Sequence, residues 1–148
     1  MKTKLFLILF LCAGYMQAQI FEPVIWKTSV EKISDTEYDL IVTAKIEKGW
    51  HLYSQSVPEG GPVATSFSFE ENTNYLKKGN TTEEKGHTVN DPIFEMEIKY
   101  FSDAARFTQR IKLRNDQAFQ INGIVTFMVC DDSRCLPPTS EDLTFTIK

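Results

Sequence analysis

The sequence predicts an all-β protein folded as an antiparallel β-sandwich, and three observations support this prediction. Apolar and polar residues alternate with a period of two in several stretches, which is the pattern of half-buried antiparallel strands. Turn-forming residues separate these stretches at short intervals, and seven or more short strands joined in this way are typical of a sandwich. No helical period of 3.6 residues is sustained after the N-terminal segment.

Residues 1–18 have the composition of a signal peptide. Two lysines precede a short apolar run from Leu5 to Cys12, and this run is too short to cross a bilayer as a stable helix. Cleavage is expected after Ala18, which leaves residues 19–148 as one exported domain.

The exported chain of about 130 residues is acidic. The formal net charge of −4 becomes −6 once Lys2 and Lys4 are removed with the signal. An acidic chain without a basic cluster is unsuited to nucleic acid or to an anionic membrane surface. No second apolar run of about 20 residues follows, so we expect a protein that is not embedded in the membrane.

Four strand candidates occupy the first half of the domain. They are Val24–Ile33, Tyr38–Ile46, the aromatic segment Trp50–Tyr53 and Thr65–Phe69. Lys48-Gly49 and the proline- and glycine-rich segment from Pro58 to Pro62 separate them. The polar stretch from Asn72 to Asn90 shows no strand pattern, and the charged run Glu83-Glu84-Lys85 within it is interpreted as solvated loop.

Four more strand candidates follow in the second half. They are Phe94–Tyr100, Phe107–Leu113, Phe119–Val129 and Leu143–Ile147. Asp91-Pro92 opens a turn before the first of them, and on pattern alone Phe94 is one of its alternating core residues. In the third, apolar residues share one face up to Val129, so Cys130 is predicted to lie on the opposite face.

The chemistry of the chain is expected at Cys130 and Cys135, which lie just before Pro137-Pro138. Cysteines of an exported protein meet an oxidising compartment, so a disulfide is the expected state. It would close a ring of six residues, and so small a loop stabilises by only about 2 kcal/mol in the chain-entropy model. A redox switch and an inert structural disulfide both remain open on spacing alone.

A metal site is a third alternative for these cysteines. Cys130 and Cys135 have a spacing that zinc or copper(I) ligands can use, with His51 and Met128 as further candidates. A zinc site usually shows a second paired motif, and the two histidines stand alone, so we expect no metal. His51 is interpreted as a strand-surface histidine, because nothing beside it in sequence orients it.

Three segments together resemble the N-terminal periplasmic domain of the thiol:disulfide interchange protein DsbD. They are Gly49-Trp50-His51-Leu52-Tyr53, Asp91-Pro92-Ile93-Phe94, and Cys130 to Cys135 with Leu136-Pro137-Pro138. The resemblance extends from about Phe21 to Lys148 and implies an immunoglobulin-like sandwich in the periplasm. It also implies a cysteine pair that takes electrons from a thioredoxin-like domain and passes them to periplasmic disulfide proteins.

The resemblance assigns different roles to the two cysteines. Cys135 resembles the cysteine that forms mixed disulfides with partners, and Cys130 resembles the one that completes the intramolecular bridge. The neighbouring charges point the same way, because Asp131 and Asp132 should disfavour a thiolate on Cys130 while Arg134 should favour one on Cys135. The family's best-known member has one more residue between its cysteines.

Other residues are expected around the bridge by resemblance. His51 and Tyr53 fall where the family has two tyrosines near the active site, so His51 departs from that pattern. The segment that begins at Asp91 resembles the cap loop that shields the bridge, with Phe94 as the shielding aromatic and Ile93 as the alternative one residue away.

The chain ends at Lys148, before the membrane electron carrier and the thioredoxin-like domain of full-length members. We therefore expect a stand-alone domain that needs no cofactor beyond its cysteines. Its electron donor would be a thioredoxin-like domain or a membrane electron carrier on a separate chain, and its acceptor a periplasmic disulfide isomerase or reductase. Such a domain would be a component of a protein-disulfide reductase. The rival interpretation is a non-catalytic secreted β-sandwich binding module whose bridge only fixes a loop.

Overall fold

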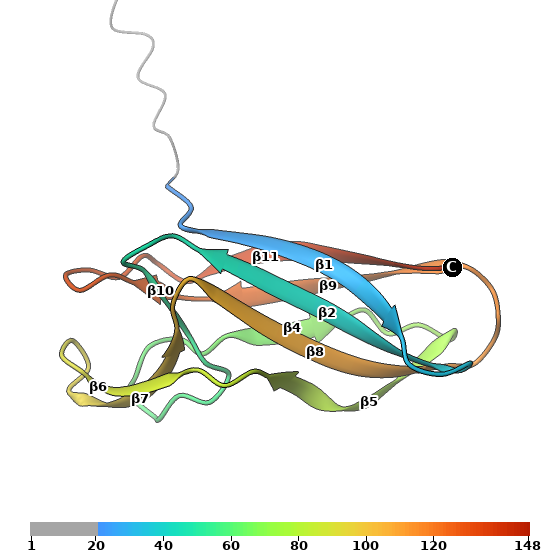
Figure 1. Cartoon of the computed structure of the whole chain (residues 1–148), viewed down its shortest axis with the longest axis horizontal. Coiled ribbons are helices and arrows are strands. Elements are labelled where there is room, and N and C mark those ends of the chain that lie inside the picture. Colours follow the sequence, from blue (N-terminus) through green and yellow to red (C-terminus); the bar gives the residue numbers. More distant parts are fainter. Residues whose placement is uncertain (1–20) are drawn as a thin grey trace, which may run out of the picture.

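The computed structural model describes residues 21–148, and the predicted signal peptide lies outside this part (Figure 1). These residues form eleven strands: β1 (Val24–Lys32), β2 (Glu37–Ile46), β3 (His51–Tyr53), β4 (Ser66–Phe69), β5 (Tyr75–Glu83), β6 (His87–Asp91), β7 (Met96–Phe101), β8 (Ala104–Leu113), β9 (Phe119–Phe127), β10 (Val129–Cys130) and β11 (Thr139–Ile147). Within them no helix is long and apolar enough to cross a membrane. The all-β prediction is confirmed.

The strands form three antiparallel sheets, with the orders β1-β2-β8-β5, β11-β9-β4 and β10-β3-β7-β6. The first two pack face to face, and their inward side chains share the main core. The third sheet continues from them at one end, because β3 follows β2 after four residues and β10 follows β9 after one. In Figure 1 this end lies at the left, with the loop between β6 and β7 and the loop after β10 both projecting from it.

Aromatic packing holds the two main sheets together. Phe107 of β8 is fully buried, and its ring lies 4.9 Å from that of Phe67 and 6.0 Å from that of Trp26, measured between centroids. Trp26 also meets Phe127 of β9 at 5.1 Å. Burying a side chain of this size stabilises a fold by roughly 1.5–3 kcal/mol. The sandwich therefore has a substantial core that does not involve the cysteines.

Two differences from the sequence expectation affect the site. β5 and all of β6 except Asp91 lie in the stretch from residue 72 to residue 90. This stretch shows no strand pattern, because most of its strand side chains are exposed on both faces. Phe94 belongs to a turn rather than to a strand, since β6 ends at Asp91 and β7 begins only at Met96. Glu95 completes that turn with a positive φ of 54°.

Candidate functional site

The site lies on the face of the β10-β3-β7-β6 sheet that points away from the main core. Leu52 pairs with Val129 on one side and with Phe101 on the other, and all three belong to the main core. The neighbouring residues Cys130 and Tyr53 point to the opposite face, because side chains alternate along a strand. They form a second small buried cluster there. The prediction that Cys130 and Val129 lie on opposite faces is confirmed.

A disulfide joins Cys130 and Cys135 across a tight turn. The turn is closed by two backbone hydrogen bonds, from the Asp131 N–H to the Arg134 carbonyl at 2.9 Å and from the Leu136 N–H to the Val129 carbonyl at 2.9 Å. Cys130 is only 1% exposed, whereas Cys135 is half-buried. A thiol that approaches from solvent therefore meets Cys135 first.

The Asp131 carboxylate organises the turn between the cysteines. Its Oδ1 accepts hydrogen bonds from the N–H groups of Ser133 and Arg134, both at 2.8 Å. These bonds hold the pKa of Asp131 below its ordinary value. The Arg134 Nε lies 3.6 Å from Asp131 Oδ2, and its guanidinium lies 5.7 Å from the ring centre of Trp50. The Arg134 charge was expected to favour a thiolate on Cys135, and Asp131 partly balances it.

Asp91 fixes the loop between β6 and β7. Its buried carboxylate accepts hydrogen bonds at Oδ1 from the N–H groups of Ile93 and Phe94, at 2.8 and 3.1 Å. Its Oδ2 accepts the Tyr53 hydroxyl at 3.2 Å, and its carbonyl accepts the Glu95 N–H at 2.8 Å. Burial and the Asp91 charge raise the pKa of Tyr53, which keeps this phenol a hydrogen-bond donor. The loop is therefore tied to β3 beside the bridge.

Phe94 lies in this loop beside the cluster that contains the buried cysteine. It packs against the cluster of Tyr53, Ile98 and Cys130, and its ring meets Tyr53 edge-on at 6.1 Å. The other half-buried side chains around the cluster are Val57, Met96, Tyr100, Met128 and Cys135. Ile93, the alternative to Phe94 for the shielding position, is 42% exposed. Sequence reasoning did not single out Val57 and Met96, which carry no signal beyond being apolar.

His51 is held by residues far away in sequence. Its Nδ1 lies 3.1 Å from the Ser102 hydroxyl in the turn between β7 and β8, and its Nε2 lies 3.5 Å from Asp132 Oδ1 in the turn between the cysteines. The imidazole also lies 4.3 Å from the ring of Tyr100, measured between centroids. The sequence indicated no group that orients this ring, and the structure supplies three.

A second polar cluster supports β3 from behind the site, at Glu83. The Glu83 carboxylate accepts hydrogen bonds from the hydroxyl of the fully buried Ser54, from the Gln55 N–H at 2.8 Å and from the Lys99 ammonium at 2.8 Å. Burial raises the pKa of Glu83, but these hydrogen bonds outweigh it and lower the pKa below its ordinary value. The interpretation of residue 83 as solvated loop is wrong.

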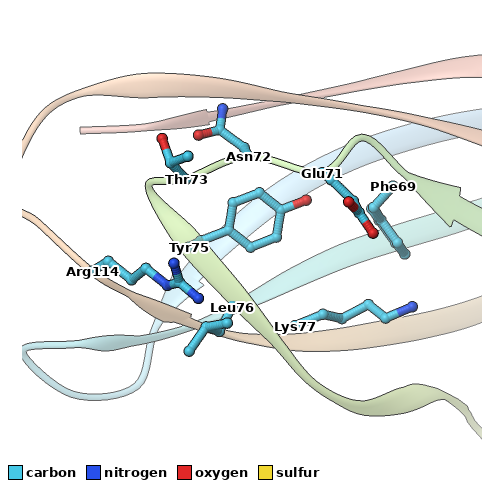
Figure 2. Close-up of a pocket in the computed structure, with 8 residues that line it drawn as sticks. All are labelled: Phe69, Glu71, Asn72, Thr73, Tyr75, Leu76, Lys77 and Arg114. Carbon is cyan, nitrogen blue, oxygen red and sulfur yellow. The ribbon is translucent and has the colours of Figure 1, made fainter.

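Other parts of the described chain offer less chemistry. Within residues 21–148 no three His, Cys, Asp or Glu side chains converge as metal ligands do. The hollow in Figure 2, of about 550 Å³, lies at the end of the sandwich away from the disulfide. Its central Tyr75 donates its hydroxyl to the Glu70 carbonyl at 2.6 Å. The disulfide and the loop between β6 and β7 remain the candidate site.

Fold and site together define a class: an immunoglobulin-like β-sandwich that carries a disulfide in one loop. The sequence model of the family described as thiol:disulfide interchange protein DsbD, N-terminal, matches residues 20–147. The chain belongs to this family, and the resemblance seen in the sequence is confirmed. Family membership supports a role in thiol–disulfide exchange.

Solved structures agree with this fold. The reduced N-terminal domain of DsbD from Neisseria meningitidis is 13% identical, with a TM-score of 0.56 over 85% of this chain and 91% of that one. The complex of the DsbD and PilB N-terminal domains from the same organism gives 12% identity and a TM-score of 0.55, over 85% and 87%. The N-terminal periplasmic domain of ScsB from Proteus mirabilis gives 17% and 0.54, over 84% and 48%. No curated protein matches the chain.

Proposed function

We propose that this chain is a periplasmic exchange domain that relays two electrons through Cys130 and Cys135 between separate proteins. The observation that carries the proposal is the unequal burial of Cys130 and Cys135 beside Phe94. Cys135 is half-buried, whereas Cys130 is 1% exposed and belongs to the cluster against which Phe94 packs. Such a bridge has one side for a partner to attack and one side that stays within the protein.

The exchange proceeds in two balanced steps. The thiolate of a reduced partner attacks the sulfur of Cys135, a partner–Cys135 disulfide forms, and the electron pair of the broken bond moves to Cys130. The partner's second thiol then displaces Cys135, which leaves two cysteine thiols here and a disulfide in the partner. The same steps in reverse, with Cys135 as the attacking thiolate and Cys130 resolving the mixed disulfide, reduce an acceptor.

The partners follow from the same chemistry. The donor is a thioredoxin-like domain or a membrane electron carrier on another chain, and the acceptor is a periplasmic disulfide isomerase or reductase. A solved complex of a related DsbD N-terminal domain with a PilB N-terminal domain supports binding between separate chains. The pair carries the two electrons in its reduced form, as two thiols, and gives them up when the disulfide re-forms, so the relay requires no further cofactor. A cysteine pair in an exported chain supports the periplasmic location.

We expect Cys130→Ala to accumulate mixed disulfides through Cys135. In this variant Cys135 is a free thiol that can still attack a partner's disulfide, but the resolving thiol is gone, so the mixed disulfide persists. The measurement is a non-reducing gel of the exported protein with and without dithiothreitol, followed by mass spectrometry of the adduct. The expected adduct joins Cys135 to a cysteine of a thioredoxin-like or disulfide isomerase protein.

The matched control is Cys135→Ala, which leaves the buried Cys130 as the single thiol of the domain and should form few adducts. Equal trapping by both variants would contradict the assignment of roles. The rival binding module predicts no adduct with either variant. It also predicts a reduction potential below about −300 mV, which is typical of structural disulfides, whereas an exchanging bridge lies above that value.

A further inference from the structure

His51 is the cross-strand neighbour of Cys130. The two residues pair directly between β3 and β10, so their side chains project from the same face of the sheet. Directly opposite residues of an antiparallel pair have Cβ atoms about 4.5–5.5 Å apart. On its other side His51 reaches Ser102, and the hydroxyl and imidazole are in hydrogen-bonding contact. The imidazole therefore projects from the same face of the sheet as Cys130, between Ser102 and Asp132.

Hydrogen-bond acceptors surround the His51 ring. Asp132 from the turn between the cysteines faces Nε2, and a carboxylate can only accept there. The Ser102 hydroxyl can accept from Nδ1, and the face of Tyr100 from β7 lies against the ring. An imidazolium thus finds an acceptor at each nitrogen and an aromatic face beside it. Its side chain is 23% exposed, so protons exchange with solvent.

The other nearby cations are engaged elsewhere. Arg134 is bound to Asp131 and lies over Trp50, and Lys99 of β7 is bound to Glu83. Among the described residues on this face of the sheet, His51 is therefore placed to supply positive charge beside Cys130. Cys130 needs that charge at one moment only, when the bridge opens and its sulfur becomes a thiolate inside an apolar cluster.

We propose that protonated His51 stabilises the thiolate that forms on Cys130 when a partner opens the bridge, and so sets the rate of exchange as a function of pH. This inference rests on the proposed exchange function and adds a residue to it. The attacking thiolate bonds to Cys135, the Cys130–Cys135 bond breaks, and its electron pair remains on Cys130. The imidazolium balances that charge and then gives up its proton, leaving a neutral thiol and a neutral imidazole.

The test is the opening of the bridge by dithiothreitol in the mature oxidised chain, followed between pH 5 and pH 9. Each rate constant is divided by the fraction of dithiothreitol that is present as thiolate at that pH. This removes the pH dependence that comes from the reagent itself. The wild-type constant should rise as pH falls, because only the protonated imidazole carries a positive charge. The constant for His51→Gln, which carries no charge at any pH, should stay flat.

At pH 5.5 we expect the wild type to react about tenfold faster than His51→Gln, the effect of about 1.4 kcal/mol of thiolate stabilisation. At pH 8.5 the two should agree within about twofold, because neutral imidazole adds no charge. His51→Tyr should behave like His51→Gln, which guards against a folding defect in one variant. The matched control is His87→Gln, the other histidine, exposed on β6 at 6.2 Å from Tyr100 and not beside Cys130. It should keep the wild-type profile.

Two results would overturn the inference. One is a rise toward low pH that survives in both His51 variants. The other is a rate lowered by the same factor at every pH, which would indicate a purely structural role. Either result still shows a bridge that opens, and so leaves the exchange function standing. The failure of that function would appear differently, as the absence of trapped partners in the Cys130→Ala variant.

Discussion

Phe94→Ala should accelerate the reduction of the Cys130–Cys135 bridge by dithiothreitol at pH 7 about tenfold. This factor corresponds to a free energy of roughly 1.4 kcal/mol for moving the Phe94 ring away from the bridge in the wild type, a step that the variant does not need. The physical reason is access. Phe94 packs on the cluster that contains Cys130 and Tyr53, and alanine leaves that side of the bridge uncovered. The measurement is the second-order rate constant for reduction, with the loss of the disulfide followed by thiol titration.

Ile93→Ala is the matched control for this experiment. Ile93 belongs to the same loop and donates its N–H to the same Asp91 carboxylate, but its side chain is 42% exposed and lies outside the cluster. Its rate should stay within about twofold of the wild type, since surface substitutions of this kind usually change free energies by no more than 0.5 kcal/mol. Equal rates for Phe94→Ala and the wild type would exclude the shielding role.

Glu83→Ala should destabilise the domain by about 3 kcal/mol, since it removes three acceptor contacts from partly buried donors. The hydroxyl of Ser54 and the N–H of Gln55 lose their carboxylate, and the Lys99 ammonium keeps only the Glu84 carbonyl at 3.2 Å. Urea denaturation at pH 7, followed by tryptophan fluorescence, measures the loss. Glu84→Ala is the control, because that neighbouring side chain is exposed, and it should change the stability by less than 0.5 kcal/mol.

The contribution of Glu83 should also depend on pH with a defined sign. Its pKa is lower in the folded chain than its ordinary value of 4.5. A carboxylate of this kind stabilises fully above its unfolded pKa, and its contribution is lost as pH falls through the lowered folded pKa. The stability difference between wild type and Glu83→Ala should therefore be constant from pH 7 to about pH 5. It should shrink below pH 4.5. A difference that grows on acidification would contradict the hydrogen-bonded carboxylate.

The sequence predicted the strands that bury one face. In β9 the side chains of Ile121, Val125 and Phe127 are buried while Gln120 and Asn122 are exposed, and this alternation is visible in the residue types. β5 was missed because backbone pairing with β8 holds it at an edge of its sheet, and its side chains are mostly exposed on both faces. Edge pairing of this kind leaves no pattern in the hydropathy of the segment.

The site was predictable only where its residues carry their own signal. Two cysteines in one short loop of an exported chain predict a disulfide. The alternation of side chains along a strand places Cys130 on the face opposite Val129. The partners of His51 are separated from it by 51 and 81 positions, and those of Glu83 by 16 to 29. Contacts at such separations are created by the pairing of strands, so local sequence does not reveal them.

The two clusters of buried side chains lie on opposite faces of the β10-β3-β7-β6 sheet, so the packing that stabilises the fold is separate from the proposed electron relay. Leu52 and Val129 pack into the main core from one face, while Cys130 lies in the small cluster on the other face. Repeated oxidation and reduction should accordingly leave the architecture of the domain intact. The surroundings of the sulfur can then change in the course of evolution, as with a histidine in place of tyrosine, without loss of the framework that carries them.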